Sequence, residues 1–93
     1  MAIETRPFDV AEYLDSPEMI AAYLEAAFEE RDPAFIRSAL KTVARAVGMT
    51  SLQEKTGLKR ETLYKALGED GNPTLDTLTR ILDAFGVRLA VAA

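Results

Sequence analysis

The chain has 93 residues, of which 48% are hydrophobic and 28% charged, a composition typical of a folded globular protein. It contains no Cys and no His, which excludes disulfides, cysteine or histidine metal ligands, and Ser-His or Cys-His catalysis. No apolar stretch approaches the length of a bilayer span, and the first residues lack the apolar core of an export signal. We therefore expect one cytoplasmic domain over residues 1–93, with no cofactor and no enzymatic activity.

The net charge of −4 hides an uneven distribution along the chain. Residues 1–36 carry a net charge of −7, residues 37–67 carry +5, and residues 68–93 carry −2. A basic block inside an acidic chain indicates that the middle block faces a polyanion.

Capping signals predict a succession of short helices. Ser16-Pro17 and Asp32-Pro33 each combine a side-chain cap with proline in the first helical turn. Thr50 is followed three residues later by Gln53, which is a capping-box pattern. A glycine directly follows each of the last four predicted helices, as expected at helix ends. The predicted helices are Val10–Leu14, Pro17–Arg31, Pro33–Val47, Ser51–Thr56, Lys59–Leu67 and Leu75–Phe85.

Helical spacing of the apolar residues predicts one shared core, and it also points Leu75 inward. The residues expected in the core are Leu24, Phe28, Phe35, Ile36, Leu40, Val43, Leu52, Leu63, Leu67, Leu78, Ile81, Leu82 and Phe85.

The tail, residues 87–93, alternates weakly between apolar and polar positions and predicts a short C-terminal strand. A single strand in a helical chain needs a partner. We therefore expect a homodimer in which two tails pair antiparallel through Val87, Leu89 and Val91, with the apolar residues of the N-terminal helices as the alternative surface.

The stretch Thr50–Leu67 has the sequence logic of a helix-turn-helix. Leu52 and Leu63 would meet in a small core, and Gly57 would supply the left-handed turn between the two helices. The polar side chains of the second helix would then face the major groove of DNA, where Arg and Lys recognise guanine. The candidate DNA-binding residues are Thr50, Gln53, Lys59, Arg60, Glu61, Thr62, Tyr64 and Lys65.

Three observations favour less specific interpretations of this region and of the basic block. Two short helices joined at a glycine also occur in plain helical bundles. The basic stripe of Arg37, Lys41 and Arg45, spaced four apart, is interpreted as an ordinary solvated helix face, and Glu61 with Lys65 forms an i,i+4 pair that stabilises a helix by only about 0.2–0.5 kcal/mol.

The run from Leu52 to Leu89, LQEKTGLKRETLYKALGEDGNPTLDTLTRILDAFGVRL, resembles the Cro/C1-type (XRE) helix-turn-helix domain. Together with YLDSPEMIAAYLEAA and DPAFIRSALKTVARAVGM upstream, nearly the whole chain is similar to the short antidote proteins of addiction modules, the HigA-like antitoxins. Three positions depart from the usual helix-turn-helix pattern: Gln53 stands where Ala is usual, Thr56 where a bulky aliphatic residue is common, and Lys59 where Ser or Thr often begins the recognition helix. The loop residues Glu69 and Asp70 also place acids close to the expected phosphate.

This resemblance implies an all-α fold of five to six helices, with a Cro/C1-like helix-turn-helix followed by the short C-terminal strand. Residues 1–31 would form an acidic helical extension, residues 32–86 the helix-turn-helix domain, and residues 87–93 the strand. The implied function is a DNA-binding antitoxin that neutralises a RelE/ParE-like toxin and represses its own operon by binding operator DNA. The alternatives are a prophage-type transcriptional regulator without a toxin, and a protein-interaction module that has lost DNA binding.

A toxin of the implied class is expected to be basic, so the acidic N-terminal block is the expected toxin surface. Opposite charges would speed the encounter, and buried aromatic side chains would supply affinity. The competing interpretation is that the aromatic residues only cover the core and the acids only keep the chain in solution. The candidate partner-binding residues are Phe8, Glu12, Tyr13, Asp15, Glu18 and Tyr23.

Overall fold

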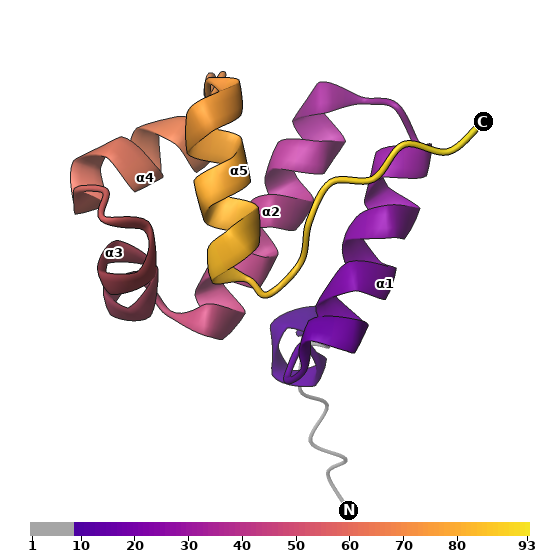
Figure 1. Ribbon diagram of the computed structural model, residues 1–93, viewed down its shortest axis with the longest axis horizontal. Helices are drawn as coiled ribbons and strands as arrows, with labels where there is room; N and C mark the ends of the chain where they lie inside the picture. Colours follow the sequence, from indigo (N-terminus) through magenta and orange to yellow (C-terminus); the bar gives the residue numbers. More distant parts are fainter. Residues whose placement is uncertain (1–8) are drawn as a thin grey trace, which may run out of the picture.

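The computed structural model of the chain describes residues 9–93, and these are helical with no strand among them (Figure 1). A single 3-10 turn precedes five α-helices. The elements are η1 (Val10–Tyr13), α1 (Pro17–Glu29), α2 (Pro33–Val47), α3 (Met49–Thr56), α4 (Arg60–Leu67) and α5 (Leu75–Ala84).

Four of the predicted helix starts are confirmed by side-chain caps. Asp9 accepts a hydrogen bond from the amide of Ala11 at 3.1 Å and begins η1. The hydroxyl of Ser16 begins α1 and the carboxylate of Asp32 begins α2, each followed by proline in the first turn. Thr74 caps α5 by accepting from the amide of Thr77 at 3.1 Å.

Other predicted boundaries are wrong by one or two residues. Helix α3 begins at Met49, because Gly48 at φ 95° turns the chain directly from α2 into α3, and Thr50 therefore lies inside the helix and does not cap it. Helix α1 ends at Glu29, two residues early, because Arg31 adopts a left-handed conformation at φ 57°. Lys59 precedes α4 as its cap residue, without a side-chain hydrogen bond.

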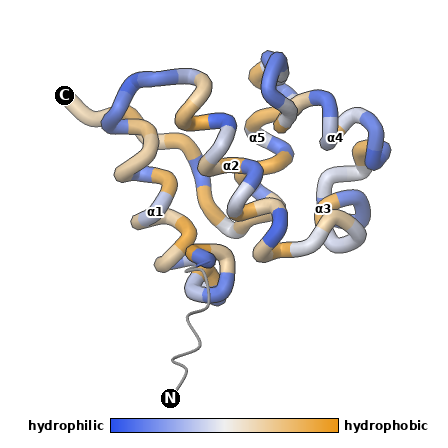
Figure 2. The backbone as a smooth tube through the Cα atoms, turned by 180° about the vertical axis from the view of Figure 1, so that it is seen from behind, coloured by the Kyte–Doolittle hydropathy of each residue, from blue (hydrophilic) through white to orange (hydrophobic). Residues whose placement is uncertain are grey.

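Helix α2 is the central element of the fold. It packs against η1, α1, α3 and α4, while α5 packs against α3. Both backbone views place η1 and α1 on one side of the molecule and α3 and α4 on the other, with α2 and α5 between them (Figures 1 and 2). The buried core runs through all five α-helices: Leu14, Ile20, Leu24, Ala27, Ala39, Leu40, Val43, Ala44, Leu52, Leu63, Ala66, Leu67, Ile81, Leu82, Ala84 and Phe85.

Two residues expected to point inward are exposed. The side chain of Phe35 is 45% exposed and that of Leu75 is 69% exposed. Both lie in the first turn of a helix, Phe35 in α2 and Leu75 in α5, and the apolar stripe of each helix is not fully covered there. Phe28, Ile36 and Leu78 are partly buried and pack against the core.

The predicted C-terminal strand is wrong. Residues 87–93 have no regular secondary structure. The tail follows α5 through the amide of Val87, which donates to the carbonyl of Leu82 at 3.0 Å, and then runs across α2 towards α1 (Figure 1). Of the three expected dimerisation residues, Val87 is half-buried, Leu89 is exposed and Val91 is fully exposed.

Within the described part of the chain, no helix has both the length and the apolar character needed to cross a membrane.

Candidate functional site

The turn between α3 and α4 has the geometry that its sequence predicts. Gly57 ends α3 in the left-handed conformation at φ 71°, and Leu52 and Leu63 are completely buried on either side of the turn. Thr56 is buried too, and its hydroxyl donates to the carbonyl of Leu52 and accepts from the amide of Leu58. Both hydrogen bonds satisfy the buried hydroxyl, so Thr56 fits this position without the aliphatic side chain that is usual there.

Helix α4 divides sharply into a buried and an exposed face. Leu63, Ala66 and Leu67 anchor it in the core. All the polar side chains predicted on its outer face are exposed: Lys59, Arg60, Glu61, Thr62, Tyr64 and Lys65. On α3, Thr50 is exposed and Gln53 is half-buried. The backbone tube of α3 and α4 is drawn mostly blue and white at the outer edge of the molecule (Figure 2).

Arg60 and Tyr64 form a pair on the outer face of α4. A guanidinium nitrogen of Arg60 donates to the hydroxyl of Tyr64 at 3.0 Å, and the guanidinium carbon lies 5.3 Å from the centre of the ring. This cation–π contact holds the Arg60 side chain along the helix surface. The pair is exposed, and the guanidinium group has four N–H donors besides the one on Tyr64.

Two arginines from other helices hold the backbone just before and just after α4. Arg37 of α2 donates to the carbonyl of Glu69, after α4, at 2.8 Å. Arg80 of α5 donates to the carbonyl of Thr56, before α4, at 3.3 Å, and also pairs with Asp76 at 3.1 Å. These two guanidinium groups therefore position α4 and do not belong to its exposed face.

Sequence reasoning missed that the basic stripe of α2 adjoins α4. Lys41 and Arg45 line a small pocket of about 100 Å³ together with Tyr64. Arg45 is paired with the carboxylate of Asp9 at 3.1 Å, whereas Lys41 has no ion pair within residues 9–93. The spacing of four between these cations was the available signal, but only the packing of α2 against α4 places them beside Tyr64.

The opposite side of the molecule carries the predicted partner residues. Glu12, Asp15 and Glu18 are exposed on η1 and the start of α1, and Tyr13 is 54% exposed. Tyr23 is half-buried and packs against the core, so it contributes less surface than expected. Phe8 lies outside the described residues.

An all-helical chain with a polar, cation-rich helix on one side and an acidic helix on the other has the features of a small binding protein. The chain belongs to the family described as "probable addiction module antidote protein", whose model matches residues 4–93. A protein of Haemophilus influenzae described as an uncharacterized protein is 40% identical to it over 91 residues, which cover 98% of this chain and 94% of that protein. No solved structure matches the chain significantly.

Proposed function

We propose that the protein is the DNA-binding antidote of an addiction module, which represses its own operon and neutralises a RelE/ParE-like toxin in the cytoplasm. The observation that carries the DNA-binding half is the outer face of α4, where exposed donor side chains stand on a helix anchored by three buried residues. Membership of the antidote family supports the toxin-binding half.

In this proposal α3 and α4 form a Cro/C1-like helix-turn-helix with α4 as the recognition helix. Lys59 and Arg60 stand at the N-terminal end of α4, the end that reaches base edges in the major groove. Arg60 can form a bidentate pair with guanine, and Tyr64 can contact a phosphate or a thymine methyl. Thr50 and Gln53 on α3 would contact the phosphate backbone. The repressor would act as a homodimer, since two copies match a palindromic operator.

A gel-shift assay on DNA from the chain's own promoter tests this half of the proposal. Arg60→Ala should cost about 1–3 kcal/mol of binding free energy if Arg60 recognises a base. Binding of the unaltered protein should weaken steeply as salt rises, because phosphate contacts release counterions. The absence of a specific shift at low salt would refute operator binding.

The toxin half rests on the acidic surface of η1 and α1. Between Asp9 and Glu30 the chain has seven carboxylates, listed below, and no cation, and Arg45 of α2 pairs with the first of them, Asp9. A basic partner would be attracted to this surface, and Tyr13 would supply a partly exposed aromatic anchor. This surface lies away from α4 (Figure 1), so one copy can hold DNA and toxin on different sides. The carboxylates are Asp9, Glu12, Asp15, Glu18, Glu25, Glu29 and Glu30.

Reversing Glu12, Asp15 and Glu18 to Lys separates the two activities. The triple variant should associate more slowly with the toxin encoded beside it, while its gel shift on operator DNA stays nearly unchanged. Arg60→Ala is the matched control, since it should weaken operator binding and leave toxin association intact. An unchanged association rate for the triple variant at low salt would show that this acidic surface does not bind the toxin.

A further inference from the structure

Arg60 and Tyr64 stand one helical turn apart on the exposed face of α4, and the helix geometry brings their side chains together. Because helical side chains lean towards the N-terminus, the ring of Tyr64 extends over the turn that carries Arg60. The guanidinium carbon lies 5.3 Å from the ring centre, and a guanidinium nitrogen donates to the hydroxyl at 3.0 Å. Arg60 is therefore held at two points, although it is an exposed residue at the start of the helix.

The side chain that holds Arg60 carries no charge. Arg45 of α2 is instead held by the carboxylate of Asp9 at 3.1 Å. A carboxylate occupies N–H donors that an anionic ligand would use, and its charge offsets that of the arginine. No ion pair of Arg60 is found within residues 9–93. Tyr64 therefore orients Arg60 and leaves its positive charge available to DNA.

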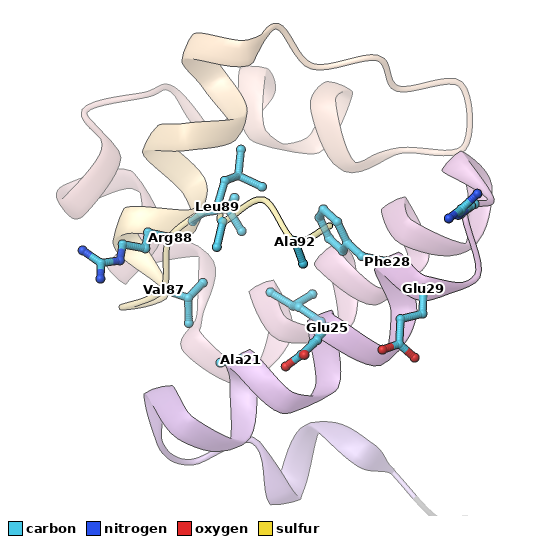
Figure 3. A pocket seen from close by; sticks show the side chains of 12 residues that line it. Ala21, Glu25, Phe28, Glu29, Val87, Arg88, Leu89 and Ala92 are labelled. Atoms are coloured by element: carbon cyan, nitrogen blue, oxygen red, sulfur yellow. The ribbon is translucent and has the colours of Figure 1, made fainter.

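The open groove on the other side of the molecule lacks this arrangement. It has a volume of about 510 Å³ and lies between α1 and the tail, where Glu25 and Glu29 line it together with Arg88 (Figure 3). Charges of both signs border the same space, so charge does not select a ligand for the groove. On α4, by contrast, an arginine is held in place by an uncharged partner.

The hydrogen bond to Tyr64 leaves Arg60 able to pair with guanine. A guanidinium group has two edges with two parallel N–H donors each, and the nitrogen bonded to Tyr64, Nη2, contributes one N–H to either edge. One hydrogen bond from Nη2 therefore occupies one edge and leaves the other complete. The free edge can donate to O6 and N7 of a guanine in the major groove.

Holding Arg60 in advance favours guanine over the other bases. A free arginine side chain has many rotamers, and ordering it on binding costs free energy. Without Tyr64, this cost falls on the complex with guanine, where Arg60 becomes ordered, and hardly on a complex with another base, where Arg60 gains no partner. Tyr64 therefore raises the affinity for an operator with guanine more than the affinity for its variants.

We propose that Tyr64 is a positioning residue for base recognition, which holds Arg60 so that its free edge meets a guanine of the operator. This role rests on the operator binding of the proposed function and adds what fixes the orientation of the recognising side chain. It replaces a direct contact with a phosphate or a thymine methyl as the role of Tyr64.

Fluorescence anisotropy on the operator and its single base-pair variants tests this role with the full chain. Arg60→Ala first identifies the guanine, as the base pair at which the preference is lost. At that base pair Tyr64→Leu, which removes the ring and the hydroxyl, should lower the preference about three- to tenfold. Tyr64→Phe keeps the ring and should lower it less. The preferences at all other base pairs should stay unchanged.

Two controls separate positioning from other roles of Tyr64. Tyr64→Leu added to Arg60→Ala should have no further effect, because Tyr64 then has no guanidinium group to hold. Phe35→Leu removes a ring of similar exposure outside α4, 45% against 50% for Tyr64, and should leave operator binding unchanged.

A measurement on the free protein checks the pair without DNA. The ring current of Tyr64 should shift the side-chain proton resonances of Arg60 in NMR spectra relative to those of Tyr64→Leu, and Tyr64→Phe should keep this shift. Identical Arg60 resonances in the unaltered protein and in Tyr64→Leu would overturn the proposal.

The DNA measurements distinguish this role from operator binding itself. The positioning role would be overturned, with operator binding standing, if Tyr64→Leu kept the guanine preference in full, weakened binding to every variant equally, or added to the effect of Arg60→Ala. An Arg60→Ala variant that keeps every base preference would have the same consequence. An unaltered protein with no specific binding to its operator at low salt would overturn both.

Discussion

The side of the molecule formed by α3 and α4 differs from the side formed by η1, α1 and the tail in how completely its apolar side chains are covered. On the α4 side, exposed polar side chains stand over a completely closed core, and arginines from α2 and α5 fix the backbone. On the α1 side, an acidic helix borders an open groove, and the tail beyond Val87 has no backbone hydrogen bond within the described residues. The apolar side chains of one side are covered within the single chain, whereas those of the other side are partly uncovered.

In the proposed function, the two sides divide two binding tasks between them. DNA has a regular surface, so a rigid helix that needs no rearrangement would suit it. A protein partner supplies its own apolar surface and can complete a core that one copy leaves open. Helix α2 packs against both sides, so the two surfaces share one support.

The largest expected effect comes from Leu63→Ala, which removes a completely buried side chain beneath α4. The lost burial and the cavity should lower the free energy of unfolding by about 2–5 kcal/mol, measured by chemical denaturation. If the two sides share one cooperative core, hydrogen-exchange protection should fall in α1 as well as in α4. Leu75→Ala, at an exposed leucine, is the control and should stay within about 0.5 kcal/mol of the unaltered protein. Loss of protection confined to α3 and α4 would show that the sides unfold separately.

Gly71→Ala should affect the α4 side next most strongly. The amide of Gly71 donates to the carbonyl of Gly68 at 2.9 Å, and a Cβ added at Gly71 would overlap the backbone carbonyl of Ala66 at the end of α4. Relieving that overlap requires backbone movement, so stability should fall by about 1–3 kcal/mol in thermal or chemical denaturation. Asn72→Ala changes the adjacent exposed residue and should have almost no effect. Equal stabilities for the two variants would contradict the close packing of this turn.

Arg31 gives a smaller test on the α1 side. Its left-handed φ of 57° suits glycine and strains any side chain that carries a Cβ. Arg31→Gly should therefore be more stable than Arg31→Ala by about 1 kcal/mol, because both lose the charge and only glycine loses the strain. Urea denaturation of the pair measures the difference. Equal stability would mean that the chain after α1 relaxes freely.

Lys41→Gln should have the smallest effect and shows how far the cationic surface extends onto α2. If Lys41 contacts an operator phosphate, the variant should reduce the salt dependence of operator binding by about one unit of slope, uniformly across related sequences. Fluorescence anisotropy titrations at several salt concentrations measure this slope. Lys55→Gln is a comparison at an exposed cation on α3. An unaltered slope for Lys41→Gln would confine the DNA surface to α3 and α4.

Local sequence signals predicted most helix boundaries, since a capping side chain or a helix-ending glycine acts within a few residues. Ser16 and Asp32 mark their helices correctly, and Gly57 adopts the conformation expected of it. The prediction that Thr50 caps α3 is wrong, because Gly48 turns the chain into α3 two residues earlier.

Features that depend on packing between distant parts of the chain could not be predicted from the sequence. The tail alternates like a strand, but a strand requires a neighbour, and the tail lies across helices instead. Phe35 follows the apolar stripe of α2, yet its side chain remains 45% exposed. For the candidate site, the exposed residues of α4 followed from helical periodicity, whereas the position of Lys41 beside Tyr64 required the contact between α2 and α4.

Arg37 and Arg80 hold the chain on either side of α4 by donating to the carbonyl oxygens of Glu69 and Thr56. Every amino acid has a carbonyl oxygen, so these two hydrogen bonds place no demand on which side chains α4 displays. The exposed positions of α4 can therefore change without loss of these two backbone contacts. If α4 is the recognition helix of the proposed function, substitutions confined to one face of one eight-residue helix would alter which operators the protein binds.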